Sequence, residues 1–137
     1  MEMLSQSSQI VDFGQLIIRE EQCTTPHHLP VLHLICSGYF DGFQEGPDGK
    51  VSAYFEHILP QKSARIIVNI RQVTVYSDLA PALVMKLAGR LRQQHGDVLV
   101  AEPSGAVRNI MKCLQMPFAQ TVEDAMAQLD EACSAFP

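Results

Sequence analysis

Short apolar runs alternate with longer amphipathic segments along this chain, and the alternation restricts the folds that it can adopt. The runs at residues 31–36, 66–70 and 98–101 are rich in Val, Ile and Leu and have the length of buried strands. Apolar residues in the segments between and after them recur every three or four positions, as they do on the buried side of a helix. Such an order of strands and helices predicts βαβ units, a largely parallel sheet and right-handed crossovers.

The whole pattern predicts one α/β domain over residues 13–137, with a mainly parallel sheet of four or five strands and four helices. Strands are expected at 16–20, 30–36, 65–76 and 98–101, with a very short strand at 118–119, and helices at 51–59, 77–95, 105–116 and 122–136. The first twelve residues are rich in Ser and Gln and show little periodicity. Residues 1–12 are therefore expected to form a flexible tail or a loosely docked arm.

The expected ends and buried stripes of three helices can be read from their residues. Pro60 is expected to close the first helix, and Ser104 and Thr121 are expected N-caps, because their hydroxyls accept hydrogen bonds from a free first turn. The stripes expected to face the core are Val107, Ile110, Met111 and Leu114 in one helix, and Val122, Ala125, Met126, Leu129, Cys133 and Phe136 in the last.

Composition and charge exclude several classes of partner. A chain of 137 residues has ten Lys and Arg against fifteen Asp and Glu, a net charge of -5, and no basic cluster, which argues against binding nucleic acid or an anionic membrane surface. Its apolar runs are far shorter than the roughly 18 residues of a membrane-spanning helix. The N-terminus carries an acid where a secretory signal carries bases, and the four cysteines show no tight pairing, so a cytoplasmic location is expected.

Cysteine and histidine, the residues that zinc prefers, gather between positions 23 and 36. They are Cys23, His27, His28, His33 and Cys36. Their spacing fits no established zinc finger, and an odd number of positions separates His33 from Cys36, so in one strand they point to opposite faces. No metal or other cofactor is expected, and a metal-assisted enzyme at this cluster is kept only as an alternative.

Three motifs, in order and at matching spacing, resemble the STAS domain, the fold of bacterial anti-sigma factor antagonists. Residues 38–41, Gly-Tyr-Phe-Asp, are similar to the family's Gly-x-Leu-Asp element. Residues 73–83 occupy the place of the strand-to-helix segment that typically reads Val-Thr-Phe-Ile-Asp-Ser-Ser-Gly-Leu-Gly. Residues 98–110 are close to the family's strand, Ser-Pro-Ala-Val-Arg turn and helix. The resemblance covers roughly residues 14–133.

The resemblance implies a non-enzymatic domain that binds a protein partner, a serine kinase of the anti-sigma type or a related regulator. In a parallel sheet the chain leaves each strand at its carboxyl end, where ligands and partners usually bind, so three turns are expected to share one rim. The residues assigned to this rim are Asp41, Tyr76, Ser77, Asp78, Leu79, Glu102 and Ser104. Three of these are acids, but without a partnering His, Lys or metal they favour caps and solvated loop ends over catalysis.

The family's phosphorylation switch is absent or altered in this chain. In the ungapped register Ser77 stands at the family's Asp, Asp78 at the phosphorylated Ser and Leu79 at the second Ser. Asp78 supplies a permanent anion to the start of a helix, either as an N-cap alone or as a partial imitation of phosphate as well. Ser77 is retained as a candidate phosphorylation site.

Other functions remain open on the same fold. One is a scaffold subunit of a larger STAS assembly, and another is an accessory subunit of a lipid-transport ATPase. A third, from a different class, is a small-ligand or nucleotide sensor that uses the same rim. The sequence leaves the partner, the pathway and any homo-oligomeric state undetermined.

Overall fold

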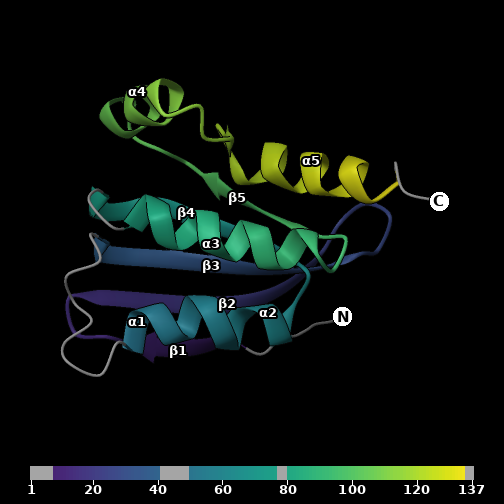
Figure 1. The fold of residues 1–137 in the computed structure, drawn as a ribbon, viewed down its shortest axis with the longest axis horizontal. Helices are drawn as coiled ribbons and strands as arrows, with labels where there is room; N and C mark the ends of the chain where they lie inside the picture. The colour runs from purple at the N-terminus through teal and green to yellow at the C-terminus, as the bar shows by residue number, and fades with distance from the viewer. Residues whose placement is uncertain (1–7, 41–49, 77–79, 135–137) are drawn as a thin grey trace.

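The computed structural model describes residues 8–40, 50–76 and 80–134, with side chains as far as Glu131, and shows a sheet flanked by helices (Figure 1). The six strands are β1 (Ser8–Asp12), β2 (Leu16–Thr24), β3 (Pro30–Phe40), β4 (Arg65–Tyr76), β5 (Asp97–Ala101) and β6 (Phe118–Ala119). The helices are α1 (Lys50–Ala53), the π-helical turn η3 (Tyr54–Ile58) and α2 (Leu59–Lys62), which form one continuous stretch, then α3 (Ala80–Arg92), α4 (Gly105–Cys113) and α5 (Val122–Ser134).

The strands lie in the sheet in their sequence order, from β1 to β6. The pairs β1–β2 and β2–β3 are antiparallel, whereas β3–β4, β4–β5 and β5–β6 are parallel, so the predicted mainly parallel α/β sheet is confirmed. The sheet has six strands where four or five were expected. The sixth is β1, which occupies part of the expected tail: it pairs with β2, and Val11 packs against the core. This strand was not predicted because five residues are too few to show a clear alternation of apolar and polar side chains within a Ser/Gln-rich segment.

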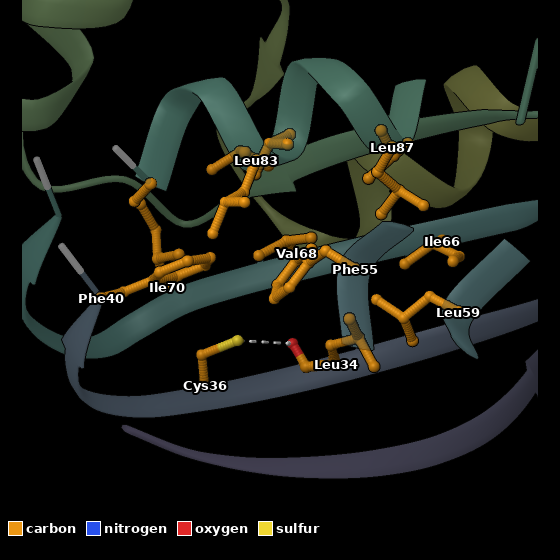
Figure 2. Close-up of a cluster of buried hydrophobic side chains, with 14 of the residues drawn as sticks. Leu34, Cys36, Phe40, Phe55, Leu59, Ile66, Val68, Ile70, Leu83 and Leu87 are labelled. Atoms are coloured by element: carbon orange, nitrogen blue, oxygen red, sulfur yellow. Dashed lines mark hydrogen bonds between the residues drawn. The ribbon is translucent and has the colours of Figure 1, made fainter. Parts of the chain in front are cut away.

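Helices cover both faces of the sheet, and the sheet separates the core into two clusters. On one face Ile66 and Val68 of β4 pack beneath Leu83 and Leu87 of α3, and Phe55 of η3 lies beside them (Figure 2). On the other face α5 covers a smaller cluster of Val31, Ile67, Leu99, Ala101, Ala119, Ala125 and Leu129. Alternate residues of β4 are therefore buried on opposite faces, which explains its nearly continuous apolar run.

The first helical stretch passes Pro60, where it was expected to stop. Pro60 lies in the first turn of α2, directly after the π-helical turn, in which the backbone N–H of Leu59 donates to the carbonyl of Tyr54 five residues earlier. This wider turn accommodates proline, which has no N–H to donate. The helix therefore continues to Lys62, whose ammonium donates to the buried carboxylate of Glu20 on β2 at 2.7 Å. The hydroxyl of Tyr54 donates to the same carboxylate, so two helical side chains hold this stretch to β2.

The expected buried stripe of α4 is wrong at two of its four positions. Met111 is buried and Val107 packs partly against the core, but Ile110 is 47% exposed and Leu114 57% exposed. The reason is the place of α4, which lies beyond the carboxyl end of β5 at a corner of the molecule (Figure 1). Among the residues that the structure describes, Met111 and Val107 belong to or pack against the core cluster and Ile110 and Leu114 do not, so one edge of the apolar stripe reaches the core.

The last helix follows its prediction as far as its side chains are described. Ala125 and Leu129 are buried, and Val122 and Met126 are partly buried against the second cluster. Cys133 and Phe136 fall outside the described side chains. The longest helices of the described segments, α3 and α5, have 13 residues each, and no helix there has the length and apolarity to span a membrane.

Candidate functional site

A notch opens where β5 ends and its neighbour β4 continues. The two strands pair from Arg65 opposite Asp97 to Asn69 opposite Ala101, where β5 stops. Strand β4 runs on to Tyr76 because its other neighbour, β3, stays paired with it as far as Phe40 opposite Tyr76. In the part of the chain that the structure describes, the second half of β4 therefore has a partner strand on one side only. The turn that leaves β5 and the start of α4 lie on the other side.

A cavity of about 270 Å³ lies in this notch. Its lining residues come from β4, the β5–α4 turn, α4 and the segment before α5, and they are Ile70, Arg71, Val73, Tyr76, Glu102, Pro103, Ser104, Val107 and Gln120. We call it the rim cavity. Of the seven residues assigned to the rim from sequence, it brings together Tyr76, Glu102 and Ser104. The other four, Asp41, Ser77, Asp78 and Leu79, lie outside the described residues.

Ser104 begins α4 as an N-cap, as predicted. Its backbone is extended, and its Oγ accepts a hydrogen bond from the backbone N–H of Val107 at 3.3 Å. This bond satisfies one of the N–H groups that a helix leaves free at its start. The hydroxyl of Ser104 is thereby positioned at the mouth of the rim cavity.

Glu102 connects the β5–α4 turn to the start of α5. Its backbone has a φ of 62°, the left-handed region that a residue with a Cβ adopts at a cost. Its Oε2 accepts from the backbone N–H of Val122 at 2.9 Å, and the Oγ1 of Thr121 accepts from Asp124 in the same first turn at 3.0 Å. A carboxylate is stabilised at the positive end of a helix. Glu102 therefore has a structural role that does not depend on any ligand.

Tyr76 forms part of the wall of the rim cavity and also belongs to the larger core cluster. Its ring packs edge-on against Phe40, with ring centroids 5.4 Å apart. Burial raises the pKa of its hydroxyl above the ordinary value, and Cys36 nearby adds to the effect. Among the described residues this buried hydroxyl has no hydrogen-bond partner.

Arg71 and Gln120 also line the cavity, and the sequence analysis assigned neither of them a role. Arg71 is exposed, and its guanidinium forms no ion pair with any residue that the structure describes. Gln120 accepts a hydrogen bond from the guanidinium of Arg108 at 3.0 Å. The signal in the sequence is the position of Arg71, the first charged residue after the apolar run of β4. It marks the point where β4 passes the end of β5.

The Cys and His residues between 23 and 36 do not converge. Cys36 lies in the larger core cluster, where burial raises its pKa to about 12, whereas His33 faces the opposite side and hydrogen-bonds Asn69 at 3.2 Å. His27 instead contacts Asp130 of α5. Within residues 8–40, 50–76 and 80–131, no three His, Cys, Asp or Glu side chains are grouped so that they could hold a metal ion.

The architecture described above is the STAS fold, as the sequence motifs predicted. It resembles the solved structure of the unphosphorylated anti-sigma factor antagonist SpoIIAA, with a TM-score of 0.56 and 16% identity, over 90% of this chain and 98% of that one. It also resembles the Bacillus cell fate determinant SpoIIAA in its phosphorylated form, with a TM-score of 0.55 and 14% identity, over 89% and 98% of the two chains. No protein-family model matches the sequence, and no curated protein matches it significantly.

Proposed function

We propose that this protein is a non-enzymatic regulator that binds another protein through the rim formed by Asp41, residues 76–79 and residues 102–104. The observation that carries the proposal is the rim cavity, because Tyr76 at the end of β4 lines one hollow together with Glu102 and Ser104 of the β5–α4 turn. It lies at the carboxyl end of the parallel strands, where partners of such sheets usually bind. The STAS fold supports the same assignment, since both SpoIIAA structures are of a regulator.

The partner that we propose is a serine kinase of the anti-sigma type, or a related regulator in a partner-switching pathway that controls transcription in the cytoplasm of a bacterium. The two SpoIIAA structures are of an unphosphorylated and a phosphorylated form. In this chain Asp78 stands where the family carries its phosphorylated Ser. Such a kinase is therefore expected to leave Asp78 unmodified and to modify Ser77 weakly or not at all.

The charge of Asp78 gives the proposal a direction that can be measured. A carboxylate carries a charge of -1, against roughly -1.5 to -2 for a phosphoserine, so it imitates the phosphorylated state only in part. If it does so, Asp78→Asn and Asp78→Ser both relieve a repulsion at the interface and tighten the complex about five- to a hundredfold, with a smaller gain at high salt. Asn also keeps the N-cap oxygen, so stability changes little.

The test is calorimetric titration of a purified anti-sigma-type kinase with the wild type, Asp78→Asn and Asp78→Ser. Asp124→Asn removes an exposed acid on α5 and serves as the matched control, with unchanged affinity expected. Weaker binding of both Asp78 variants would mean that the carboxylate contacts the kinase directly. No binding by any form would refute the proposed kinase partner, and mass spectrometry after incubation with ATP would detect a phosphate on Ser77.

A second function is favoured by the volume of the rim cavity. Small-molecule sites usually measure about 300–1,000 Å³, and the rim cavity lies just below that range. A nucleotide or another small ligand is therefore the alternative occupant. Titration with ATP and GTP in the absence of any protein partner separates the two functions.

A further inference from the structure

We propose that the rim cavity receives one aromatic side chain of the partner protein, Tyr or Trp, next to an acidic residue that pairs with Arg71. The inference rests on the proposed function of the rim as a protein-binding surface. It adds which kinds of side chain the partner protein presents to the rim cavity. It also gives a role to Arg71, which no motif of the sequence marked.

The volume of the cavity suits an aromatic ring. An apolar cavity of about 150 Å³ engineered into another protein is large enough to bind benzene. The rim cavity measures about 270 Å³ and is open to solvent at the notch, so it has room for a larger ring that enters from outside. Protein interfaces concentrate their binding energy in a few such pockets, filled most often by Trp, Tyr or Arg.

The residues that line the cavity range from buried and largely apolar to exposed and polar. Ile70, Tyr76 and Pro103 are buried, whereas Arg71 and Gln120 are exposed. Tyr and Trp match this gradient, because each carries an apolar ring and one polar group that needs a hydrogen-bond partner. A purely aliphatic side chain would leave the polar mouth of the cavity without hydrogen bonds.

The charges at the mouth select an acidic neighbour for the aromatic residue. Arg71 is a cation without an ion pair in the described part of the chain, and a carboxylate is its best partner because the guanidinium can bind it with two hydrogen bonds. The other charge in the lining, Glu102, already accepts from the first N–H of α5. A chain with a net charge of -5 repels acidic segments elsewhere, so Arg71 would fix the register of an acidic one.

The inference is tested by selecting random peptides displayed on phage against the immobilised wild-type protein. The expected result is a consensus of Tyr or Trp within a few residues of Asp or Glu. Arg71→Glu is expected to weaken these peptides about fivefold or more and to select Lys or Arg in place of the acid, with the aromatic residue retained. Arg71 is exposed, so this variant is expected to fold.

A second variant fills the cavity itself. Val107→Trp is expected to remove the aromatic residue from the consensus, whereas Leu114→Trp, a substitution at an exposed position just past α4, leaves the selection unchanged. Circular dichroism verifies that each variant is folded. If Val107→Trp does not fold, the peptides selected by Arg71→Glu test the inference. The inference is overturned if no consensus emerges, if Arg71→Glu selects the same peptides, or if ATP or GTP displaces the selected peptides.

The selection also separates this inference from the proposed function. A consensus that depends on Arg71, together with no binding of any anti-sigma-type kinase, would leave the docking inference standing and remove the kinase. Kinase binding that responds to Asp78→Asn but to neither Arg71→Glu nor Val107→Trp would leave the proposed function standing and overturn the docking inference.

Discussion

The Nδ1 atom of His27 lies 2.5 Å from Oδ2 of Asp130, a residue 103 positions further along the chain. The backbone N–H of His27 donates to the other oxygen, Oδ1, at 3.2 Å, and the side chain of Thr25 also hydrogen-bonds the carboxylate. The side chain of Asp130 is 7% exposed, whereas that of His27 is 73% exposed. One carboxylate therefore fastens the turn between β2 and β3 to α5, on the face of the sheet that α5 covers.

This contact predicts a specific loss of stability in acid. The hydrogen bonds from Thr25, and then those from His27, hold the pKa of Asp130 below its ordinary value, against the opposing effect of burial. A carboxyl group with a lowered folded-state pKa stabilises the fold at any pH above its unfolded-state pKa of about 3.9, and this stabilisation is lost as the pH falls through the folded-state pKa. Asp130→Asn should therefore flatten the acid side of the stability profile.

Urea unfolding of the wild type and Asp130→Asn, from neutral pH into the acid range, measures the effect. The difference in unfolding free energy between the two proteins is expected to be largest at neutral pH and to shrink on acidification. Asp124→Asn, at an exposed acid on the same helix, is the control. A difference that does not change with pH would show that the charge of Asp130 adds nothing to folding.

Truncation to alanine at the neighbouring residues Ile110 and Met111 of α4 is expected to cost very different amounts of stability. Met111 is 1% exposed, so Met111→Ala should cost about 2 to 5 kcal/mol of stability. Ile110 is 47% exposed, so Ile110→Ala should cost less than about 1 kcal/mol. Thermal or urea unfolding of both variants provides the comparison. A loss at Ile110 equal to that at Met111 would mean that the Ile110 side of α4 is covered.

The fold could be predicted where apolar periodicity is long enough to define both an element and its buried side. Strand β4 and helix α3 are examples, and the parallel order follows from the helices between strands. The face of α4 could not be predicted, because Ile110 and Leu114 define an apolar stripe without showing what lies beneath it. That depends on where β5 ends relative to α4, which is a tertiary relationship.

The same distinction holds for the candidate site. Sequence reasoning placed Tyr76, Glu102 and Ser104 on one rim because the carboxyl ends of neighbouring parallel strands meet at one edge. It assigned no role to Arg71, because the place of this residue in the cavity depends on β4 extending past the end of β5. Nor could it find the contact of His27 with Asp130, since no periodicity connects residues so far apart.

Replacing Gly38 by alanine is expected to destabilise the fold for two reasons, its backbone conformation and a collision of the added Cβ. It has a φ of 94° and lies where the register between β3 and β4 shifts. A Cβ added there would lie 2.1 Å from the carbonyl oxygen of Gln15, which also accepts from the N–H of Tyr39. Gly38→Ala should therefore cost more than the roughly 1 to 2 kcal/mol of a left-handed backbone.

Gly14 supplies the matched control for that prediction. Its φ is 88°, but an added Cβ would meet nothing within 4 Å. Gly14→Ala should therefore show the backbone cost alone, and the difference between the two variants in urea unfolding isolates the collision with Gln15. Equal losses would mean that β3 moves away from Gln15 without cost.

The last prediction compares two buried tyrosine hydroxyls in different surroundings. The hydroxyl of Tyr54 donates to the carboxylate of Glu20, whereas that of Tyr76 has no partner among the described residues. Removing a donor from a buried charged acceptor costs about 1.5 to 3 kcal/mol, so Tyr54→Phe should destabilise the fold by that amount. Removing an unpaired buried hydroxyl relieves a desolvation penalty, so Tyr76→Phe should leave stability unchanged or raise it by about 1 kcal/mol. Urea unfolding at neutral pH measures both variants, and a loss of more than about 1 kcal/mol for Tyr76→Phe would show that its hydroxyl is paired in solution.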